Sequence, residues 1–225
     1  MREIGDAYCA TRLRVRALLE AAPPGAADLV VPACPSWTVH ATVAHLAGVS
    51  TDLVEGRLDG LASDAWTAAQ VERARGESLP ELLDRWDEHG AVVDSMADGF
   101  GAAGGQLVAD VVSHEHDLRH ALGEPGARDS DAVAIGFRFM SGGVRNRRNE
   151  AGAPPLLVRH ETGERLLGNG EPGAWLTTTR FEFLRASSGR RTVDEIDAME
   201  WSGDARPDLL LFADLFTPRT TSLGE

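Results

Sequence analysis

The sequence predicts an α+β protein in which an N-terminal four-helix bundle precedes a smaller C-terminal α/β domain. Two observations carry this prediction. In the first half, apolar residues recur at the 3.6-residue spacing of amphipathic helices, between stretches rich in proline and glycine. After Gly123, short segments of alternating apolar and polar residues, which are typical of strands, stand among shorter helical segments.

The length of 225 residues and the 43% hydrophobic content are sufficient for one large domain or two small ones. The change of pattern near Gly123 favours two. We therefore expect a helical bundle over residues 1–124 and an α/β domain over residues 125–225.

The expected bundle has four long helices, each followed by glycine or proline. They occupy residues 4–22, the segment from near Thr38 to before Gly60, residues 79–96 and residues 106–122. Residues 61–78 are expected to connect the second and third helices, with a short helix near 66–73. The glycines between residues 99 and 105 are expected to end the third helix, and Gly123 the fourth.

The C-terminal half is predicted to mix helices and strands. A helix near 133–140 leads into an arginine-rich loop, 144–155, and strands are expected at 156–160, 164–168 and 174–180. The first two strands flank Thr162-Gly163, which predicts a hairpin. Helices are expected at 181–191, 192–199 and 207–216.

Composition excludes several classes of partner. A formal net charge of −13 and a pI near 4.9 argue against nucleic acid and anionic membrane surfaces, both of which attract positive protein surfaces. No apolar run reaches the roughly 20 residues of a membrane span. The first residues lack the pattern of a secretory signal, so a cytoplasmic protein is expected. Cys9 and Cys34 are then interpreted as unreactive packing residues.

Three side chains predict a metal site. Asp110 and His114 lie four residues apart on one expected helix, which places them one turn apart on the same face. His45 lies in the middle of another apolar helix and can supply a third ligand. Three protein ligands leave a coordination position open, as in catalytic zinc sites. Two histidines and one carboxylate are also the ligand set of non-haem iron oxygenases.

The helical repeat separates these ligands from their neighbours. Relative to Asp110, His114 is rotated by about 40° and Asp117 by about −20°, whereas His116 is about −120° away. Asp117 therefore shares the ligand face and is interpreted as an acceptor that orients a ligand imidazole, or as a packing or salt-bridge residue. Glu115 and His116 are expected at the surface.

Other conspicuous side chains are given structural roles. Trp37 and Trp86 are interpreted as core or helix-staple residues rather than as platforms for a substrate. The arginines of the 144–155 segment are interpreted as a solvated face, which in so acidic a protein can also attract an anionic thiol or carboxylate: Arg145, Arg147 and Arg148.

The strings CPSWTVHATVAHLAG, DVVSHEHDLRHALG, FEFLRASSGRR and WSGDARPDLL, in this order, resemble the mycothiol-dependent maleylpyruvate isomerase family of actinobacteria. The resemblance implies a DinB-like metal-binding four-helix bundle with a C-terminal α/β domain. It also implies a divalent metal, usually zinc, and the thiol mycothiol as cofactor or co-substrate.

The resemblance assigns roles residue by residue. His45, Asp110 and His114 match the family's metal ligands, with aspartate in place of the usual glutamate, and Asp117 matches a further position of the same pattern, to which we assign a catalytic role. A family arginine associated with substrate or thiol anions matches Arg190, with Arg191 beside it. We therefore expect Arg190 to take part in catalysis and both arginines to bind the cofactor.

The expected activity is thiol chemistry. Coordination to Zn²⁺ deprotonates a thiol and supplies the nucleophile at neutral pH. The thiolate then adds to a small electrophile, for example one that carries a carboxylate, for cis/trans isomerisation or for S-transfer. The alternatives are a metalloenzyme that does not use mycothiol and a non-catalytic metal- or ligand-binding protein. A monomer and a homodimer both stay open.

Overall fold

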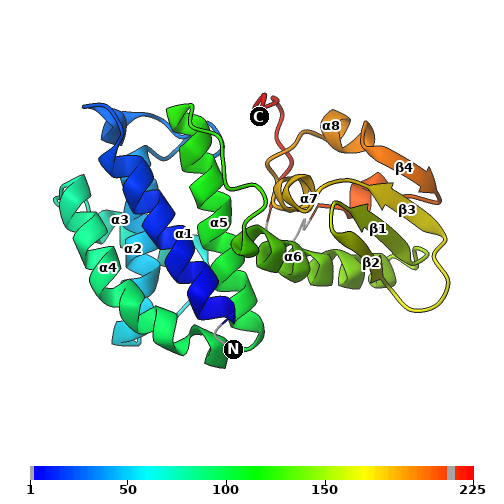
Figure 1. The fold of residues 1–225 in the computed structure, drawn as a ribbon, viewed down its shortest axis with the longest axis horizontal. Coiled ribbons are helices and arrows are strands. Elements are labelled where there is room, and N and C mark those ends of the chain that lie inside the picture. Colours follow the sequence, from blue (N-terminus) through cyan, green and yellow to red (C-terminus); the bar gives the residue numbers. More distant parts are fainter. Residues whose placement is uncertain (1–2, 212–215) are drawn as a thin grey trace. The chain divides into compact units, whose positions relative to one another are not determined.

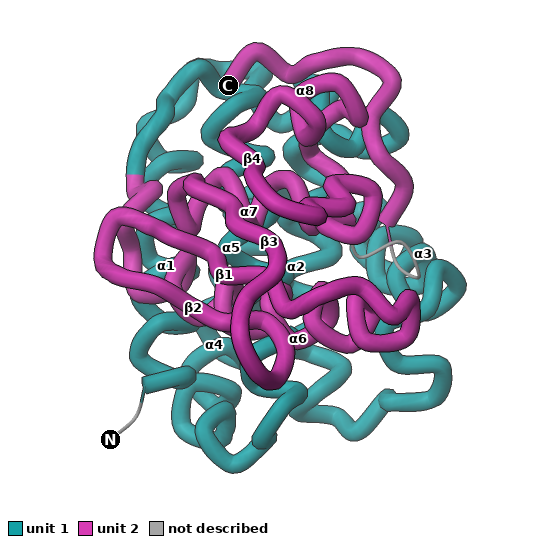
Figure 2. Tube along the Cα trace, turned by 90° about the vertical axis from the view of Figure 1, so that its right-hand side faces the viewer, with its two compact units in different colours: residues 1–126 teal, residues 127–225 magenta. Residues whose placement is uncertain are grey.

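The computed structural model describes residues 3–211 and 216–225. The chain divides into two compact units, residues 1–126 and residues 127–225 (Figure 2). The first is helical and the second contains a four-stranded sheet with helices, so the predicted α+β class is confirmed. The domain boundary after residue 124 stays a prediction, because compactness alone does not show that either part folds independently.

Five α-helices make up the described part of the first unit (Figure 1). They are α1 (Glu3–Glu20), α2 (Val39–Glu55), α3 (Asp64–Arg73), α4 (Leu79–Met96) and α5 (Ala102–Leu122). Helices α1 and α2 each pack against both α4 and α5, which is the arrangement of a four-helix bundle. Helix α3 packs against α2.

Local capping sets the ends of these helices. The Thr38 hydroxyl accepts a hydrogen bond of 3.2 Å from the Ala41 backbone N–H at the start of α2. Ser78 and Glu81 form a capping box at the start of α4. Helix α2 ends at Gly56, whose φ of 72° gives the left-handed C-cap, and not at the predicted Gly60.

The core of the bundle contains one large aromatic pair. Trp86 and Tyr8 are almost completely buried, and the indole Nε1–H of Trp86 donates to the Tyr8 hydroxyl at 3.0 Å. This bond satisfies both polar groups away from water. The core assignment of Trp86 is therefore confirmed.

The glycines before α5 were interpreted wrongly. Helix α5 begins at Ala102, so Gly104 and Gly105 lie inside it instead of in a loop. A Cβ atom on Gly104 would lie 2.8 Å from the carbonyl oxygen of Ala97. This close approach of two backbone segments requires glycine, which is a packing reason that local sequence does not reveal.

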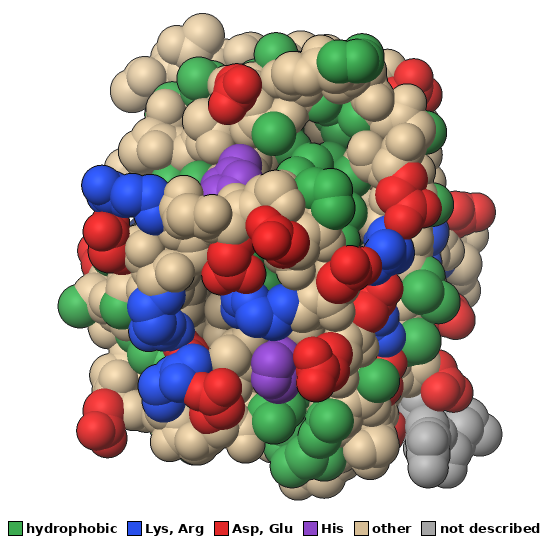
Figure 3. Space-filling model, turned by 90° about the vertical axis from the view of Figure 1, so that its left-hand side faces the viewer, with side chains coloured by type: hydrophobic (Ala, Val, Ile, Leu, Met, Phe, Trp, Pro, Cys, Tyr) green, Lys and Arg blue, Asp and Glu red, His purple; other side chains and the backbone are tan. Residues whose placement is uncertain are grey.

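The surface of the first unit mixes both signs of charge. Figure 3 shows acidic and basic side chains interspersed over one face. Ion pairs between helices contribute to this pattern: Arg16 of α1 pairs with Asp84 and Asp87 of α4 at 2.9 and 2.6 Å. Among the described residues, no helix is both long and apolar enough to cross a membrane.

The second unit has three α-helices and one four-stranded sheet in its described part (Figure 1). Its helices are α6 (Asp131–Glu150), α7 (Arg180–Ser187) and α8 (Val193–Asp197). Its strands are β1 (Leu156–His160), β2 (Gly163–Leu167), β3 (Ala174–Thr177) and β4 (Glu200–Gly203). The sequence did not indicate β4, which is short and largely exposed.

The sheet has the order β2-β1-β3-β4. Strands β1 and β2 form the predicted antiparallel hairpin, with His160 opposite Gly163. Strand β3 runs parallel to β1, and β4 antiparallel to β3. The side chains of Leu156, Val158 and Leu176 are buried, which gives the sheet one apolar face.

Three predictions for this unit are wrong. The arginine-rich segment continues α6 to Glu150 and is not a loop. Arg148 is buried, not solvated, because its guanidinium donates to the carbonyl oxygens of Ala205 and Pro154 at 2.7 and 2.9 Å. The expected helix at 207–216 is only a 3-10 turn over Pro207–Leu209 in its described part, and residues 212–215 lie outside the described residues.

Candidate metal centre

His45 is held by a chain of buried polar groups. It lies in the middle of α2, and its Nδ1 atom is 2.8 Å from Oε1 of Gln70 on α3. The Nε2 amide of Gln70 donates to Oδ2 of Asp52 at 3.0 Å. Asp52 is fully buried and also accepts hydrogen bonds from Arg57 and Arg73 at 2.6 to 2.7 Å.

This chain of bonds assigns the tautomer of His45. The Asp52 carboxylate only accepts hydrogen bonds, so the amide of Gln70 turns its N–H₂ toward Asp52 and its oxygen toward His45. The oxygen can only accept, and therefore Nδ1 of His45 carries the proton. In the neutral ring this leaves the lone pair on Nε2, the nitrogen available to a metal ion.

Nε2 of His45 faces the other two predicted ligands. It lies 3.4 Å from Oδ2 of Asp110, and Nε2 of His114 lies 3.7 Å from Oδ1 of the same carboxylate. The ligand atoms of the three residues all lie within 4.8 Å of one another. Neighbouring ligand atoms around tetrahedral zinc are about 3.3 Å apart for zinc bonds of about 2.0 Å, so a small contraction suffices. The structure thus brings together the three residues that the sequence singled out.

Burial differs among the three residues. The side chains of the two histidines are nearly buried, whereas the side chain of Asp110 is 36% exposed. The cluster is therefore open to solvent on the side of Asp110.

The surroundings of His114 favour its charged form in the metal-free protein. Burial lowers the pKa of its imidazole, but contacts with Asp117 and Cys34 and the charge of Asp110 outweigh burial and raise the pKa to about 10. Nδ1 lies 3.1 Å from Oδ2 of Asp117, close enough for an ion pair although not aligned as a hydrogen bond. The cluster is thus built to hold positive charge.

Two residues of the loop before α2 belong to this site, and the sequence assigned neither to it. The half-buried ring of Trp37 lies next to both histidine rings, with centroids 5.2 Å from His45 and 5.6 Å from His114. Trp37 is therefore not a core residue, and the core interpretation is wrong for it. Sγ of Cys34 lies 3.8 Å from Oδ2 of Asp117. Cys34 is therefore not only a packing residue. Both residues lie in a loop, and a loop has no regular residue spacing from which the direction of a side chain can be predicted.

A second group of ligand atoms shares His114 with the first. Cys34, His114 and Asp117 also bring one ligand atom each to within 4.8 Å of one another. The described part of the chain thus contains two candidate metal-binding groups with one histidine in common. Asp117 belongs to the second group, and its predicted catalytic role stays a prediction.

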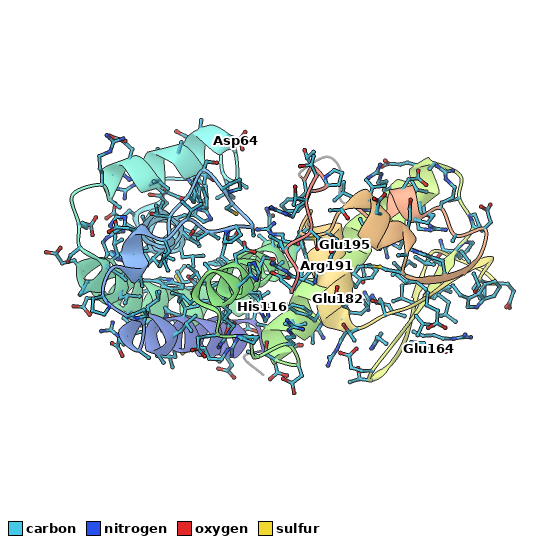
Figure 4. The ribbon with its side chains drawn as sticks, turned by 90° about the horizontal axis from the view of Figure 1, so that it is seen from above. Asp64, His116, Glu164, Glu182, Arg191 and Glu195 are labelled. Carbon is cyan, nitrogen blue, oxygen red and sulfur yellow. The ribbon has the colours of Figure 1, made fainter. Side chains whose placement is uncertain are left out.

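Two neighbours on α5 are buried, contrary to prediction. Glu115 is fully buried because Arg14 of α1, at 2.6 Å, and Arg119, at 3.0 Å, pair with its carboxylate. His116, labelled in Figure 4, is 4% exposed. Helix α5 packs against both α1 and α2, so it has little solvent-facing surface in this turn.

Arg190 and Arg191 lie in the second unit, directly after α7. Arg191 pairs with Glu182 and Glu225 at 2.8 and 2.9 Å, and Figure 4 labels the first of these partners beside it. Nη1 of Arg190 donates to the Ser188 carbonyl oxygen at 2.7 Å, and its guanidinium lies over the Phe216 ring. Both side chains are largely buried. Their proposed contacts with mycothiol or substrate stay predictions.

Comparison with known protein families gives a match in the first unit. Residues 10–109 match the family model described as the mycothiol maleylpyruvate isomerase N-terminal domain. The match spans 100 of the 225 residues and lies within the first unit. The predicted resemblance is therefore confirmed for the mycothiol maleylpyruvate isomerase N-terminal domain. The matched part of the chain includes Cys34, His45 and Gln70 and ends directly before Asp110. Comparison with curated proteins and with solved structures found no match.

Proposed function

We propose that the first unit binds a divalent metal ion, with zinc as the first candidate, through His45, Asp110 and His114. The observation that carries the proposal is the tautomer of His45, whose unprotonated Nε2 is turned toward Asp110 by Gln70. A histidine that only packs in a core needs no such chain of three buried polar groups. The spacing of the ligand atoms and the solvent-exposed side of Asp110 support the same conclusion.

The reaction that fits this site is thiol activation. A bound zinc ion lowers the pKa of a coordinated thiol and so provides a thiolate at neutral pH. The family match suggests mycothiol as the thiol and a small electrophile as its acceptor, for isomerisation or S-transfer. Asp110 holds its carboxylate at the open side, Trp37 covers both imidazoles, and Asp117 orients His114. Arg190 and Arg191 are proposed to bind the anionic groups of thiol or substrate.

Metal analysis tests the first step. Purified protein reconstituted with zinc and then desalted is expected to retain about one ion per chain. The variants His45→Ala and His114→Ala should retain almost none. His120→Ala, on the same helix but outside both candidate groups, should bind zinc like the wild type. Equal zinc in all four proteins would refute the proposed ligands.

Mycothiol titration tests the second step. Calorimetry with zinc-loaded protein should detect mycothiol binding that is lost in His45→Ala. Zinc binding without mycothiol binding would refute thiol activation and leave a metal-dependent protein that does not use mycothiol.

Proton release gives an independent prediction. Because the pKa of His114 is raised to about 10, the metal-free imidazole carries an extra proton at neutral pH that a metal ion has to displace. Zinc affinity should therefore rise about tenfold per pH unit between about pH 7 and pH 9. Calorimetric titration in buffers of different ionisation enthalpy would measure about one proton released per ion. An affinity independent of pH over this range would contradict the assignment of His114.

A further inference from the structure

The imidazole of His114 presents its two nitrogens to two different groups. Nε2 faces Asp110, at 3.7 Å, in the group that contains His45. Nδ1 faces Asp117, at 3.1 Å, in the group that contains Cys34. The two nitrogens lie on opposite sides of the ring, so the groups are adjacent and separate.

The second group has the spacing of a metal site. Tetrahedral zinc places a thiolate sulfur about 3.5 Å from a neighbouring oxygen, for bonds of about 2.3 and 2.0 Å. The observed distance from Sγ of Cys34 to Oδ2 of Asp117 is 3.8 Å, and that from Nδ1 of His114 to the same oxygen is 3.1 Å. Only small adjustments separate these distances from coordination geometry.

The state of His114 points to a ligand at this position. The residue is 7% exposed, and its Nδ1 atom makes no aligned hydrogen bond within the described ranges of the chain, despite the nearby carboxylate. The ion pair with Asp117 compensates this buried nitrogen only in part, because the geometry of a hydrogen bond is not met. A cation between Nδ1, Sγ and Oδ2 would satisfy it.

The loop that carries Cys34 is well defined. The backbone N–H of Cys34 donates to the Val31 carbonyl at 2.9 Å, and the N–H of Trp37 donates to the Cys34 carbonyl at 2.8 Å. These turns fix the backbone around Cys34 without any contribution from a metal. Cys34 is half-buried, so an ion can approach from solvent.

We propose that Cys34, Nδ1 of His114 and Asp117 form a second cation position, selective for strongly thiophilic divalent ions such as Cd²⁺. A thiolate ligand favours such ions over Mg²⁺ and Ca²⁺. Binding forms bonds from the ion to sulfur, nitrogen and oxygen, and releases the Cys34 thiol proton and the Nδ1 proton to solvent.

An ion at this second position should lower the metal affinity of the first group, His45, Asp110 and His114. This coupling rests on the proposed function, in which the first group binds a metal ion. A neutral imidazole offers one lone pair and carries its proton on the other nitrogen. An ion on Nδ1 therefore leaves the proton on Nε2, beside Asp110, and removes His114 from the first group. A thiophilic ion in excess is thus an inhibitor that acts through a shared histidine.

Cadmium titration tests the second position directly, because a cadmium–thiolate bond gives an ultraviolet charge-transfer absorption. The wild type is expected to develop this band with about one ion per chain. Cys34→Ser should lose it, with Cys34→Ala as a second variant if circular dichroism shows that the serine protein is misfolded. Cys9→Ser is the matched control, since Cys9 is also half-buried but belongs to neither metal group.

The variants separate this proposal from the proposed function. His45→Ala should keep the cadmium band, because His45 belongs only to the first group, and should lose zinc from that group. Saturating cadmium should lower zinc affinity at least tenfold more in the wild type than in Cys34→Ser, where it can act only by direct competition for the first group. A cadmium band that persists without Cys34, or that is absent from the wild type, would overturn the second position whatever His45→Ala does. Zinc affinity unaffected by cadmium would overturn the coupling.

Discussion

Replacing Asp52 by asparagine is expected to lower the zinc affinity of the first group by about 10- to 100-fold, although Asp52 is not itself a ligand. In the wild type, the carboxylate accepts from Gln70 on one oxygen and from Arg57 on the other. Asparagine has only one oxygen, and two guanidinium groups attract it more strongly than an amide does. The N–H₂ group of asparagine then faces Gln70.

The consequence passes through Gln70 to His45. Because the N–H₂ group of the introduced asparagine can only donate, the Gln70 amide turns over so that its oxygen accepts from that group. Its own N–H₂ group then faces Nδ1 of His45. Nδ1 then has to accept, so the proton moves to Nε2 and the nitrogen that faces Asp110 loses its lone pair. Nitrogen-15 NMR of the imidazole should therefore show the Nδ1–H tautomer in the wild type and the Nε2–H tautomer in Asp52→Asn.

A neighbouring carboxylate supplies the control. Glu55 also pairs with Arg57 but makes no hydrogen bond with Gln70 in the described part of the chain. Glu55→Gln is therefore expected to leave both the tautomer and the zinc affinity unchanged. Wild-type zinc affinity in Asp52→Asn would show that Gln70 keeps its orientation without Asp52.

The sequence predicted the central ligands because helical periodicity carries them. Asp110 and His114 are one turn apart on one helix, so their common face follows from 3.6 residues per turn. The position of His45 near these two residues could also be predicted, because it lies on a second apolar helix that was expected to pack against the first. The metal role of these residues remains a prediction, but their proximity is a geometric result of the fold.

The residues that support the ligands were less predictable. Gln70 lies in a segment that was interpreted mostly as a connector, and its role depends on where α3 docks on α2. Cys34 and Trp37 lie in a loop, where no period relates sequence to direction. Glu115 is buried because Arg14, more than one hundred residues earlier in the chain, neutralises it. Such contacts exist only in three dimensions.

The second large effect is expected at the end of the chain, where Glu225→Gln should destabilise the second unit by about 3–5 kcal/mol at neutral pH. The carboxylate of Glu225 is 4% exposed and accepts hydrogen bonds of 2.9 Å from both Arg185 and Arg191. Arg185 is completely buried. Glutamine leaves a buried guanidinium charge without its carboxylate, which burial in a low-dielectric interior makes costly.

The effect should depend on pH in one direction. Burial raises the pKa of Glu225, but the charges and hydrogen bonds of Arg185 and Arg191 outweigh burial and hold the pKa below its usual value. Since the folded-state pKa lies below the unfolded one, the stabilisation is present above the unfolded pKa of about 4.3 and is lost as pH falls through the folded value. Urea denaturation should show a large difference between wild type and variant at pH 7 and a much smaller one at pH 3.

Glu200→Gln is the matched control in the same unit. Glu200 is exposed at the start of β4, so its loss should change the free energy of unfolding by less than about 0.5 kcal/mol at either pH. If Glu225→Gln destabilised the protein equally at pH 7 and pH 3, the loss would come from packing and not from the carboxylate charge. If it had no effect at pH 7, water would have to reach Arg185 and replace the ion pair, and the guanidinium would not be buried in solution.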